Sequence, residues 1–230
     1  MHPFTIKNIP LTTGNGGNFS LPIRQLILAL GSAMFFMAAT GAAAIDGFDT
    51  DAAGAQPKRW KTGVTGSGNP IWTVVAEPTA PSQPNAFKQS GVGDYPWAVT
   101  DSAPILNGQV EVKFKAVSGQ VDQAAGIVWR FKNKDSYYIT RANILENNVR
   151  IYTVVDGYRR EIGSANIPLA PKKWHTVGIR FAGKHMTVLF NQRPVIELDD
   201  STYSEAGAVG LWTKEDSVTL FDDFSVTPLP

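Results

Sequence analysis

Strict alternation of apolar and polar residues is the feature that most constrains this fold. Residues 109–117 read QVEVKFKAV, which places Val110, Val112 and Phe114 on one side and Glu111 and Lys113 on the other. Successive side chains of a strand point to opposite faces, so this pattern predicts a strand with one buried face. Further short strands are expected at 126–131, 137–142, 149–155, 174–181, 186–190, 195–198, 209–212 and 218–226. No helical stripe longer than two turns follows residue 45.

Turn residues separate these strands at short intervals. Asp156-Gly157, Ala182-Gly183-Lys184 and the Asn191–Pro194 segment each predict a tight hairpin between neighbouring strands. Many short antiparallel strands in one chain favour two packed sheets, because each strand must bury its apolar face. The sequence therefore predicts an all-β fold, a two-sheet antiparallel β-sandwich of the jelly-roll type, as a single domain over residues 45–230.

Charge and composition exclude several classes of function. The chain has 21 Lys and Arg against 20 Asp and Glu, which gives a formal net charge of +1 and no general attraction for nucleic acid. It has no cysteine, which excludes disulfides, thiolate metal sites and cysteine nucleophiles. It has three histidines, too few to make a multi-histidine metal site a strong candidate.

The N-terminal segment has the layout of a signal peptide. Residues 26–39 form an apolar run after Arg24, shorter than the roughly 20 residues that cross a bilayer, and Ala42 and Ala44 supply small side chains for a peptidase. We expect residues 1–44 to be a signal peptide with a polar N-terminal extension, cleaved near Ala44. The mature protein would then be secreted or periplasmic, with no membrane association. An uncleaved membrane anchor is the alternative.

Several segments together resemble a known group of proteins. They are 54–60 (GAQPKRW), 79–85 (TAPSQPN), 126–131 (GIVWRF), 137–152 (YYITRANILENNVRIY), Trp174-His175 and 209–224 (VGLWTKEDSVTLFDDF). With these segments the chain resembles the concanavalin A-like lectin/glucanase superfamily, in particular its secreted bacterial branch of 3-keto-disaccharide hydrolase and glucanase-like domains. The resemblance implies two curved sheets, a sugar-binding groove on the concave face of one, and often a structural calcium ion. It implies no single activity, because this fold carries both binding proteins and enzymes.

A catalytic carboxylate pair is not evident from the sequence. The Glu-x-Asp-x-x-Glu strand of known glucanases on this fold is missing, since Thr202 stands where the second glutamate after Glu197 and Asp199 would be. Glu146 could meet an acid from another segment, with Glu215 and Asp216 as the nearest candidates. A solvated turn carboxylate is the alternative interpretation for both of these.

The most unusual polar surface is expected between residues 141 and 152. Val149 and Ile151 share the parity of the core, so Arg150 and Tyr152 should face away from it. Planar polar groups and aromatic rings are the side chains that bind sugars. The candidate substrate-binding residues are Arg130, Arg141, Asn143, Asn148, Arg150, Tyr152, Trp212 and Lys214.

Two of these candidates depend on strand position. Arg130 is expected on the same outer face as Arg150, with Ile127, Trp129 and Phe131 in the core. Trp212 ends a strand, where it could form a stacking platform at the groove rim or part of the core. The alternative for the whole surface is a charged, solvated sheet face.

Calcium is a second expectation from acidic residues near the two ends of the domain. Asp46 and Asp49 open the mature chain and Asp223 lies in the last strand. First and last strands pair in many jelly rolls, which would gather these carboxylates into a structural Ca²⁺ site. Edge-strand charges that discourage aggregation are the alternative. No organic cofactor is expected.

Three functions are consistent with the sequence. The first is an exported protein that binds a glycan or small saccharide in the groove. The second is a glycoside hydrolase or lyase acting on 3-keto-disaccharides or related glycosides, in which Glu146 would act as acid or base and Arg141 would polarise a carbonyl oxygen. The third is a structural interaction domain of the cell envelope.

Overall fold

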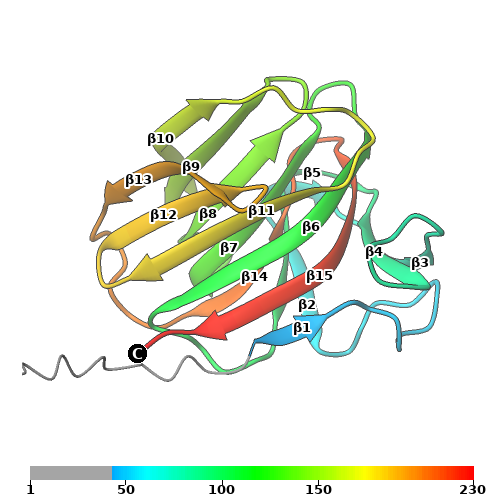
Figure 1. Ribbon diagram of the computed structural model, residues 1–230, viewed down its shortest axis with the longest axis horizontal. Helices are drawn as coiled ribbons and strands as arrows, with labels where there is room; N and C mark the ends of the chain where they lie inside the picture. Colours follow the sequence, from blue (N-terminus) through cyan, green and yellow to red (C-terminus); the bar gives the residue numbers. More distant parts are fainter. Residues whose placement is uncertain (1–42) are drawn as a thin grey trace, which may run out of the picture. The chain divides into compact units, whose positions relative to one another are not determined.

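A computed structural model describes residues 43–230, and within them the chain is all-β, as predicted. Figure 1 shows its fifteen strands. They are β1 (Ala44–Asp46), β2 (Trp60–Asn69), β3 (Trp72–Ala76), β4 (Asn85–Gln89), β5 (Val92–Thr100), β6 (Gly108–Ser118), β7 (Ala124–Asn133), β8 (Ser136–Asn143), β9 (Asn148–Val155), β10 (Tyr158–Asn166), β11 (His175–Ala182), β12 (His185–Phe190), β13 (Arg193–Asp199), β14 (Ala208–Trp212) and β15 (Val218–Pro228). Among these residues no helix is long and apolar enough to span a bilayer.

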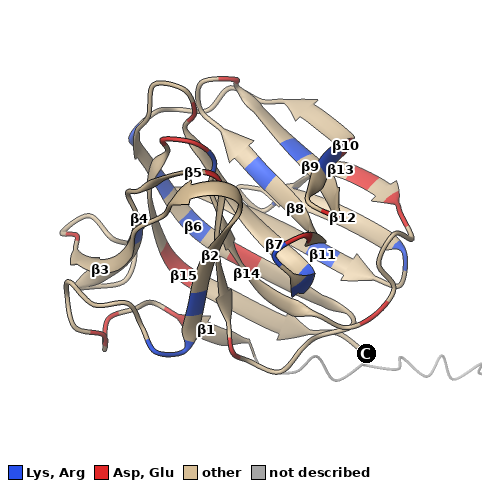
Figure 2. Cartoon of the chain, turned by 180° about the vertical axis from the view of Figure 1, so that it is seen from behind, with Lys and Arg blue, Asp and Glu red and all other residues tan. Residues whose placement is uncertain are grey.

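The strands form two antiparallel sheets that pack as a sandwich (Figures 1 and 2). Sheet A has eight strands in the order β13-β12-β11-β6-β15-β4-β3, with β1 also paired to β15. Sheet B has seven strands in the order β10-β9-β8-β7-β14-β5-β2. The predicted two-sheet antiparallel sandwich is therefore confirmed.

The predicted hairpins occur where the turn residues stand. Asp156 and Gly157 join β9 to β10 with φ values of 51° and 81°. Asn191 and Gln192 join β12 to β13 with φ values of 46° and 65°. Positive φ at both central residues is the geometry that matches the twist of a two-residue hairpin, and Gly and Asn adopt it at low cost.

The core lies between the sheets and follows the alternation of the sequence. Val110, Val112 and Phe114 of β6 are completely buried in it, as are Val149 and Ile151 of β9. Val155 has the same parity as Val149 and Ile151, but it is 41% exposed because it stands at the end of β9, beside the hairpin. Burial of these alternate side chains is what holds the two sheets face to face.

A bulge in β7 overturns the expected orientation of Arg130. Pairing between β7 and β8 is shifted between Trp129 and Asn133, and Arg130 has a φ of 47°. The extra residue reverses the parity, so Phe131 packs with the outer apolar cluster of sheet B instead of the core. Arg130 is completely buried and donates to the carbonyl oxygens of Tyr203, Leu106 and Gly183. Arg130 therefore does not share the outer face with Arg150.

The first strand of the domain pairs with the last, as in many jelly rolls and as expected from the sequence. Ala44 of β1 lies opposite Val226 of β15, and Asp46 lies opposite Phe224. Except for Ala43 and Ala44, the predicted signal peptide lies outside the described residues, and its cleavage stays a prediction.

Candidate functional site

The outer face of sheet B is concave. Arg159 belongs to β10 and Tyr95 to β5, five strand spacings apart in the sheet order. In a flat sheet these strands would lie about 24 Å from each other. The guanidinium carbon of Arg159 nevertheless lies 4.9 Å from the centre of the Tyr95 ring. The sheet must curl strongly for these side chains to meet.

A second apolar cluster fills the middle of this concave face. Its completely buried members include Val128, Ile139, Val154 and Trp212, and partly buried Tyr95 and Trp97 pack against them. The guanidinium of Arg159 lies over three of the surrounding rings, at 4.4 Å from the centre of Tyr152, 4.9 Å from Tyr95 and 5.7 Å from Trp212. Arg159 thus covers an aromatic floor, and a polar network begins at its border.

Arg141 anchors that network from β8. Its side chain is only 1% exposed, although it points to the outer face of the sheet. The guanidinium donates to the Asn148 side-chain oxygen, to Oε2 of Glu146 at 2.9 Å and to the Tyr152 hydroxyl at 3.0 Å. Gly126 lies opposite Arg141 on β7, and a Cβ there would stand 2.9 Å from the Arg141 Cβ. Such a Cβ would also stand 2.5 Å from the Thr140 carbonyl oxygen, so the glycine makes room for the β8 backbone as well as for Arg141.

Glu146 is the acceptor at the centre of the network, in the turn between β8 and β9. Its Oε1 accepts from the Asn143 amide at 3.1 Å, and its Oε2 accepts from Arg141 and from the Asn148 amide at 3.1 Å. Arg150 Nη1 lies 3.5 Å from the same oxygen. The Glu146 side chain is 38% exposed, so it is fixed by buried hydrogen-bond donors and still accessible to solvent.

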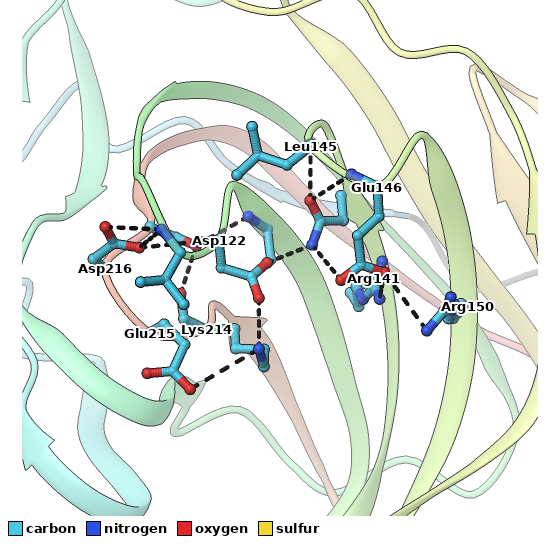
Figure 3. Close-up of polar contacts among 12 residues, drawn as sticks. Asp122, Arg141, Leu145, Glu146, Arg150, Lys214, Glu215 and Asp216 are labelled. Carbon is cyan, nitrogen blue, oxygen red and sulfur yellow. Dashed lines mark hydrogen bonds and ion pairs between the residues drawn. The ribbon is translucent and has the colours of Figure 1, made fainter.

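Asp122 connects the network to Lys214 (Figure 3). It is 1% exposed, accepts from the Asn143 amide, and accepts from Lys214 Nζ at 2.6 Å. Glu215 follows, 3.9 Å from the same ammonium group. The Asn143 amide thus joins two groups of charges, one of Arg150, Arg141 and Glu146 and the other of Asp122, Lys214 and Glu215.

Asp216, expected as a solvated carboxylate or a partner for Glu146, has a structural contact. Its carboxylate accepts the backbone N–H groups of Gln120, Val121 and Asp122, at 2.6 to 3.2 Å. These bonds hold the turn that carries Asp122. Asp216 therefore fixes the position of Asp122 in the network without itself being part of it.

The structure brings most of the predicted site residues together. Gathered around Glu146 or along the same chain of contacts are Arg141, Asn143, Asn148, Arg150, Tyr152 and Lys214. Four of them, Arg141, Asn143, Asn148 and Tyr152, are at most 3% exposed, so the expected open surface is a buried network with a partly exposed rim. Trp212 lies in the concave apolar cluster and is completely buried, not at a groove rim.

Sequence reasoning missed Asp122 and Arg159. Asp122 stands in a turn between two strands, and no local pattern distinguishes it from a solvated turn acid. Arg159 alternates with polar neighbours on an edge strand, where a charged residue is ordinary. The curl of sheet B brings Arg159 to the rings of the site. The segment after β14 brings Lys214 to Asp122.

The pKa of Glu146 limits the chemistry that it can perform. Burial by itself would raise this pKa, but the hydrogen bond from Asn148 and the positive charge of Arg141 outweigh burial and lower it. Glu146 is therefore ionised at neutral pH and has no proton to donate. A general acid in glycoside cleavage needs the opposite shift.

The three acids expected to bind calcium each contact protein groups in the structure. Asp46 accepts from Arg59 and from the Trp60 indole, and Asp223 pairs with Lys113 at 2.7 Å. Asp49 accepts the backbone N–H of Asn85. Among residues 43–230 no group of three or more His, Asp or Glu side chains is arranged to hold a metal ion. Calcium binding stays a prediction, to be tested by melting the protein with and without EDTA.

Two hollows of ligand size lie outside this network. One, of about 690 Å³, is lined by Ala44, Trp60 and Phe224 among others, beside the first described residues. The other, of about 370 Å³, lies on sheet A. The polar network is a surface held by hydrogen bonds, not a deep cavity. Its gathered charged and amide side chains, rather than its shape, make it the candidate site.

Comparisons with known structures agree with the fold. The carbohydrate-binding module CBM66 from Bacillus subtilis has 19% sequence identity and a TM-score of 0.60, over 72% of this chain and 93% of that one. Cellulose-induced protein Cip1 has 12% identity and a TM-score of 0.61, over 80% and 96%. The Bacillus licheniformis beta-glucanase has 8% identity and a TM-score of 0.56, over 83% and 99%. At these identities the likeness concerns the jelly-roll fold, which carbohydrate-binding modules and glucanases share.

Sequence comparison gives the family directly. No curated protein matches the chain significantly in sequence. The model of the 3-keto-alpha-glucoside-1,2-lyase-like domain matches residues 44–227, which is nearly the whole of the described sandwich. The chain therefore belongs to the 3-keto-alpha-glucoside-1,2-lyase-like domain family.

Proposed function

We propose that this protein is exported and binds a saccharide at the polar network around Glu146, on the concave face of sheet B. One observation carries the proposal: Arg141 is buried and held by three side chains, while Glu146 and Arg150 beside it are 38% and 33% exposed. A sugar diol needs donors and acceptors fixed in adjacent positions. A rim fixed by buried partners loses little side-chain entropy when a ligand binds.

Binding is favoured over acid catalysis by the state of Glu146. Its carboxylate is ionised and accepts from several donors, which suits the recognition of hydroxyl groups. Two proteins of similar fold, a carbohydrate-binding module and a cellulose-induced protein, support a saccharide as the ligand. No nucleic acid partner is proposed, because the chain has nearly balanced charge.

The binding proposal is tested by calorimetry with a panel of mono- and disaccharides and their 3-keto derivatives. We expect at least one member to bind, and Arg150→Ala and Glu146→Gln each to weaken that binding at least tenfold. Arg180→Ala is the matched control, since Arg180 is an exposed arginine on sheet A that contacts Gln109. Absence of binding across the panel, or equal affinity in all three variants, would refute the proposal.

Family membership favours a second function, a lyase that eliminates the glycosidic oxygen from a 3-keto glucoside. The ketone acidifies the neighbouring C2 proton, and a base takes that proton to leave an enolate. The enolate re-forms the ketone as a C1=C2 double bond forms and the C1–O bond breaks, and the departing glycosidic oxygen takes the proton back from the protonated base. Glu146 would be the base, and Arg150 would stabilise the enolate oxygen, because both Nη atoms of Arg141 are already engaged.

Turnover separates the two functions. If the chain is a lyase, the purified protein converts a 3-keto glucoside, and Glu146→Gln stops the conversion while the substrate still binds. If it binds only, no product forms with any 3-keto substrate, and Glu146→Gln weakens binding itself. A fixed-time assay of product beside the calorimetry distinguishes these results.

A further inference from the structure

A hollow of about 370 Å³ lies on sheet A, on the face that points away from the core. Its floor is apolar and consists of Val75 of β3, Val117 of β6 and Leu220 of β15. Each of these neighbours a core residue in sequence, so its side chain points to the opposite face. Hollows of roughly 300 Å³ and more with an apolar lining and a few polar groups are typical small-ligand sites.

Three lysines surround this floor. Lys88 comes from β4, Lys115 from β6, and Lys172 from the loop before β11. Glu77 is the one acidic residue in the lining. The lining therefore carries a net charge of about +2 at neutral pH.

Glu77 accounts for one lysine only. Lys115 Nζ lies 3.0 Å from Glu77 Oε1 and 2.6 Å from the Thr79 hydroxyl, and it lies 5.2 Å from the centre of the Trp174 ring. Lys88 and Lys172 form no ion pair with any residue between 43 and 230. Lys88 and Lys172 thus line a small apolar hollow whose one carboxylate, Glu77, is already paired with Lys115.

We propose that this hollow binds an anionic saccharide of one or two rings, through a phosphate, sulfate or carboxylate group that Lys88 and Lys172 share. The aliphatic floor would cover the C–H face of the ring and remove it from water, and the ammonium groups would pair with the anion. The hollow lies on the sheet opposite the Glu146 network. The inference is therefore independent of the proposed function above.

The test is calorimetry at low salt with glucose 6-phosphate, glucuronate, glucose 6-sulfate, neutral glucose and inorganic phosphate as separate probes. We expect at least one anionic sugar to bind at least tenfold more tightly than glucose and than inorganic phosphate. The affinity should fall as salt is raised from 50 to 300 mM, because the charges are exposed to screening. Which anionic sugar binds most tightly identifies the anion.

Variants locate the binding. The double variant Lys88→Gln/Lys172→Gln should lose at least tenfold in affinity. Lys113→Gln on the same face of β6 is the matched control, since Lys113 pairs with Asp223 outside the hollow, and it should bind like the natural protein. Thermal melts of all variants check that each is folded.

Three results would overturn the inference. The first is no binding of any anionic sugar at millimolar concentration. The second is unchanged binding in the double lysine variant. The third is equal affinity for inorganic phosphate and the sugar phosphate, which would show attraction by charge alone.

Discussion

The guanidinium carbon of Arg159 lies 4.4 Å from the centre of the Tyr152 ring, and the hydroxyl of the same tyrosine accepts a hydrogen bond from Arg141. Tyr152 therefore links two parts of the concave face. On one side is the aromatic floor beneath Arg159, and on the other is the polar network around Glu146. Tyr152 contacts both arginines and so marks the border between the aromatic floor and the candidate site.

Removing the Arg159 cover should destabilise the fold. Arg159→Ala removes contacts with three rings and exposes Trp212 to water, and a loss of about 1–2 kcal/mol is expected from cation–π contacts of this kind. Urea unfolding measures the loss. Trp fluorescence should also shift to longer wavelength in the folded variant.

Arg160→Ala is the matched control for this prediction. Arg160 is the next residue on the same strand, its side chain is 68% exposed, and its nearest acid, Asp200, is 3.8 Å away. Its loss should cost at most about 0.5 kcal/mol. Equal losses in the two variants would show that the ring contacts of Arg159 contribute nothing.

Neighbouring positions on β9 should respond in opposite ways to truncation. Ile151→Ala removes a completely buried core side chain, so a loss of about 2–5 kcal/mol is expected. Arg150→Ala removes a side chain that is 33% exposed and lies 3.3 and 3.5 Å from its two acids, so less than about 1 kcal/mol should be lost. Chemical denaturation compares the two directly, and a larger loss for Arg150→Ala would contradict the assigned faces.

The fold could be predicted from the sequence because its main signal is local. Alternation in β6 and β9 sets which side chains enter the core, and the turn residues at Asp156-Gly157 and Asn191 set the hairpins. β2 and β5 gave a weaker signal. These strands contain Gly63, Gly66 and Pro96, which interrupt the alternation of apolar and polar residues. The two strands are held in the sheet by their pairing with each other, which a local sequence pattern does not reveal.

The candidate site could be predicted in part. Parity in β8 and β9 correctly groups Arg141 with Arg150 and Tyr152 on one face. Parity could not place Arg130, because one bulged residue reverses the faces. Parity also could not show that Asp122 accepts a hydrogen bond from Asn143, because this contact joins a turn to the end of a strand 21 residues later.

Processing of the N-terminus gives a third prediction. We expect protein recovered from the periplasm or medium to begin at or within a few residues of Ile45, as read by N-terminal sequencing. Cleavage there would keep the contacts of Ile45 with Ser225 and of Asp46 with Phe224, so β1 could still pair with β15. Full-length protein in the membrane fraction would contradict the prediction and favour the anchor.

The last prediction concerns the pH dependence of stability through Glu146. Burial would raise its pKa, but the Asn148 hydrogen bond and the charge of Arg141 lower it below its ordinary value of 4.5. A carboxylate with a lower pKa in the folded state stabilises that state at pH values above 4.5. This contribution is lost as the pH falls through the folded-state pKa.

Glu146→Gln removes that contribution. The natural protein should be more stable than the variant at pH 7, with a nearly constant difference down to about pH 5. The difference should shrink as the pH falls further, because the natural carboxylate then becomes neutral as well. Thermal melts of both proteins between pH 3 and pH 7 measure it.

Glu205→Gln is the matched control, because Glu205 also pairs with a cation, Lys132 at 2.6 Å, but its side chain is 75% exposed. Water screens such a pair, so this variant should match the natural protein closely at every pH. If the difference between the natural protein and Glu146→Gln stays constant to pH 3, or grows there, Glu146 is not held ionised by Arg141 and Asn148. The Arg141 and Asn148 contacts, which the proposed saccharide site needs to hold Glu146 in place, would then contribute nothing to the stability of the folded state.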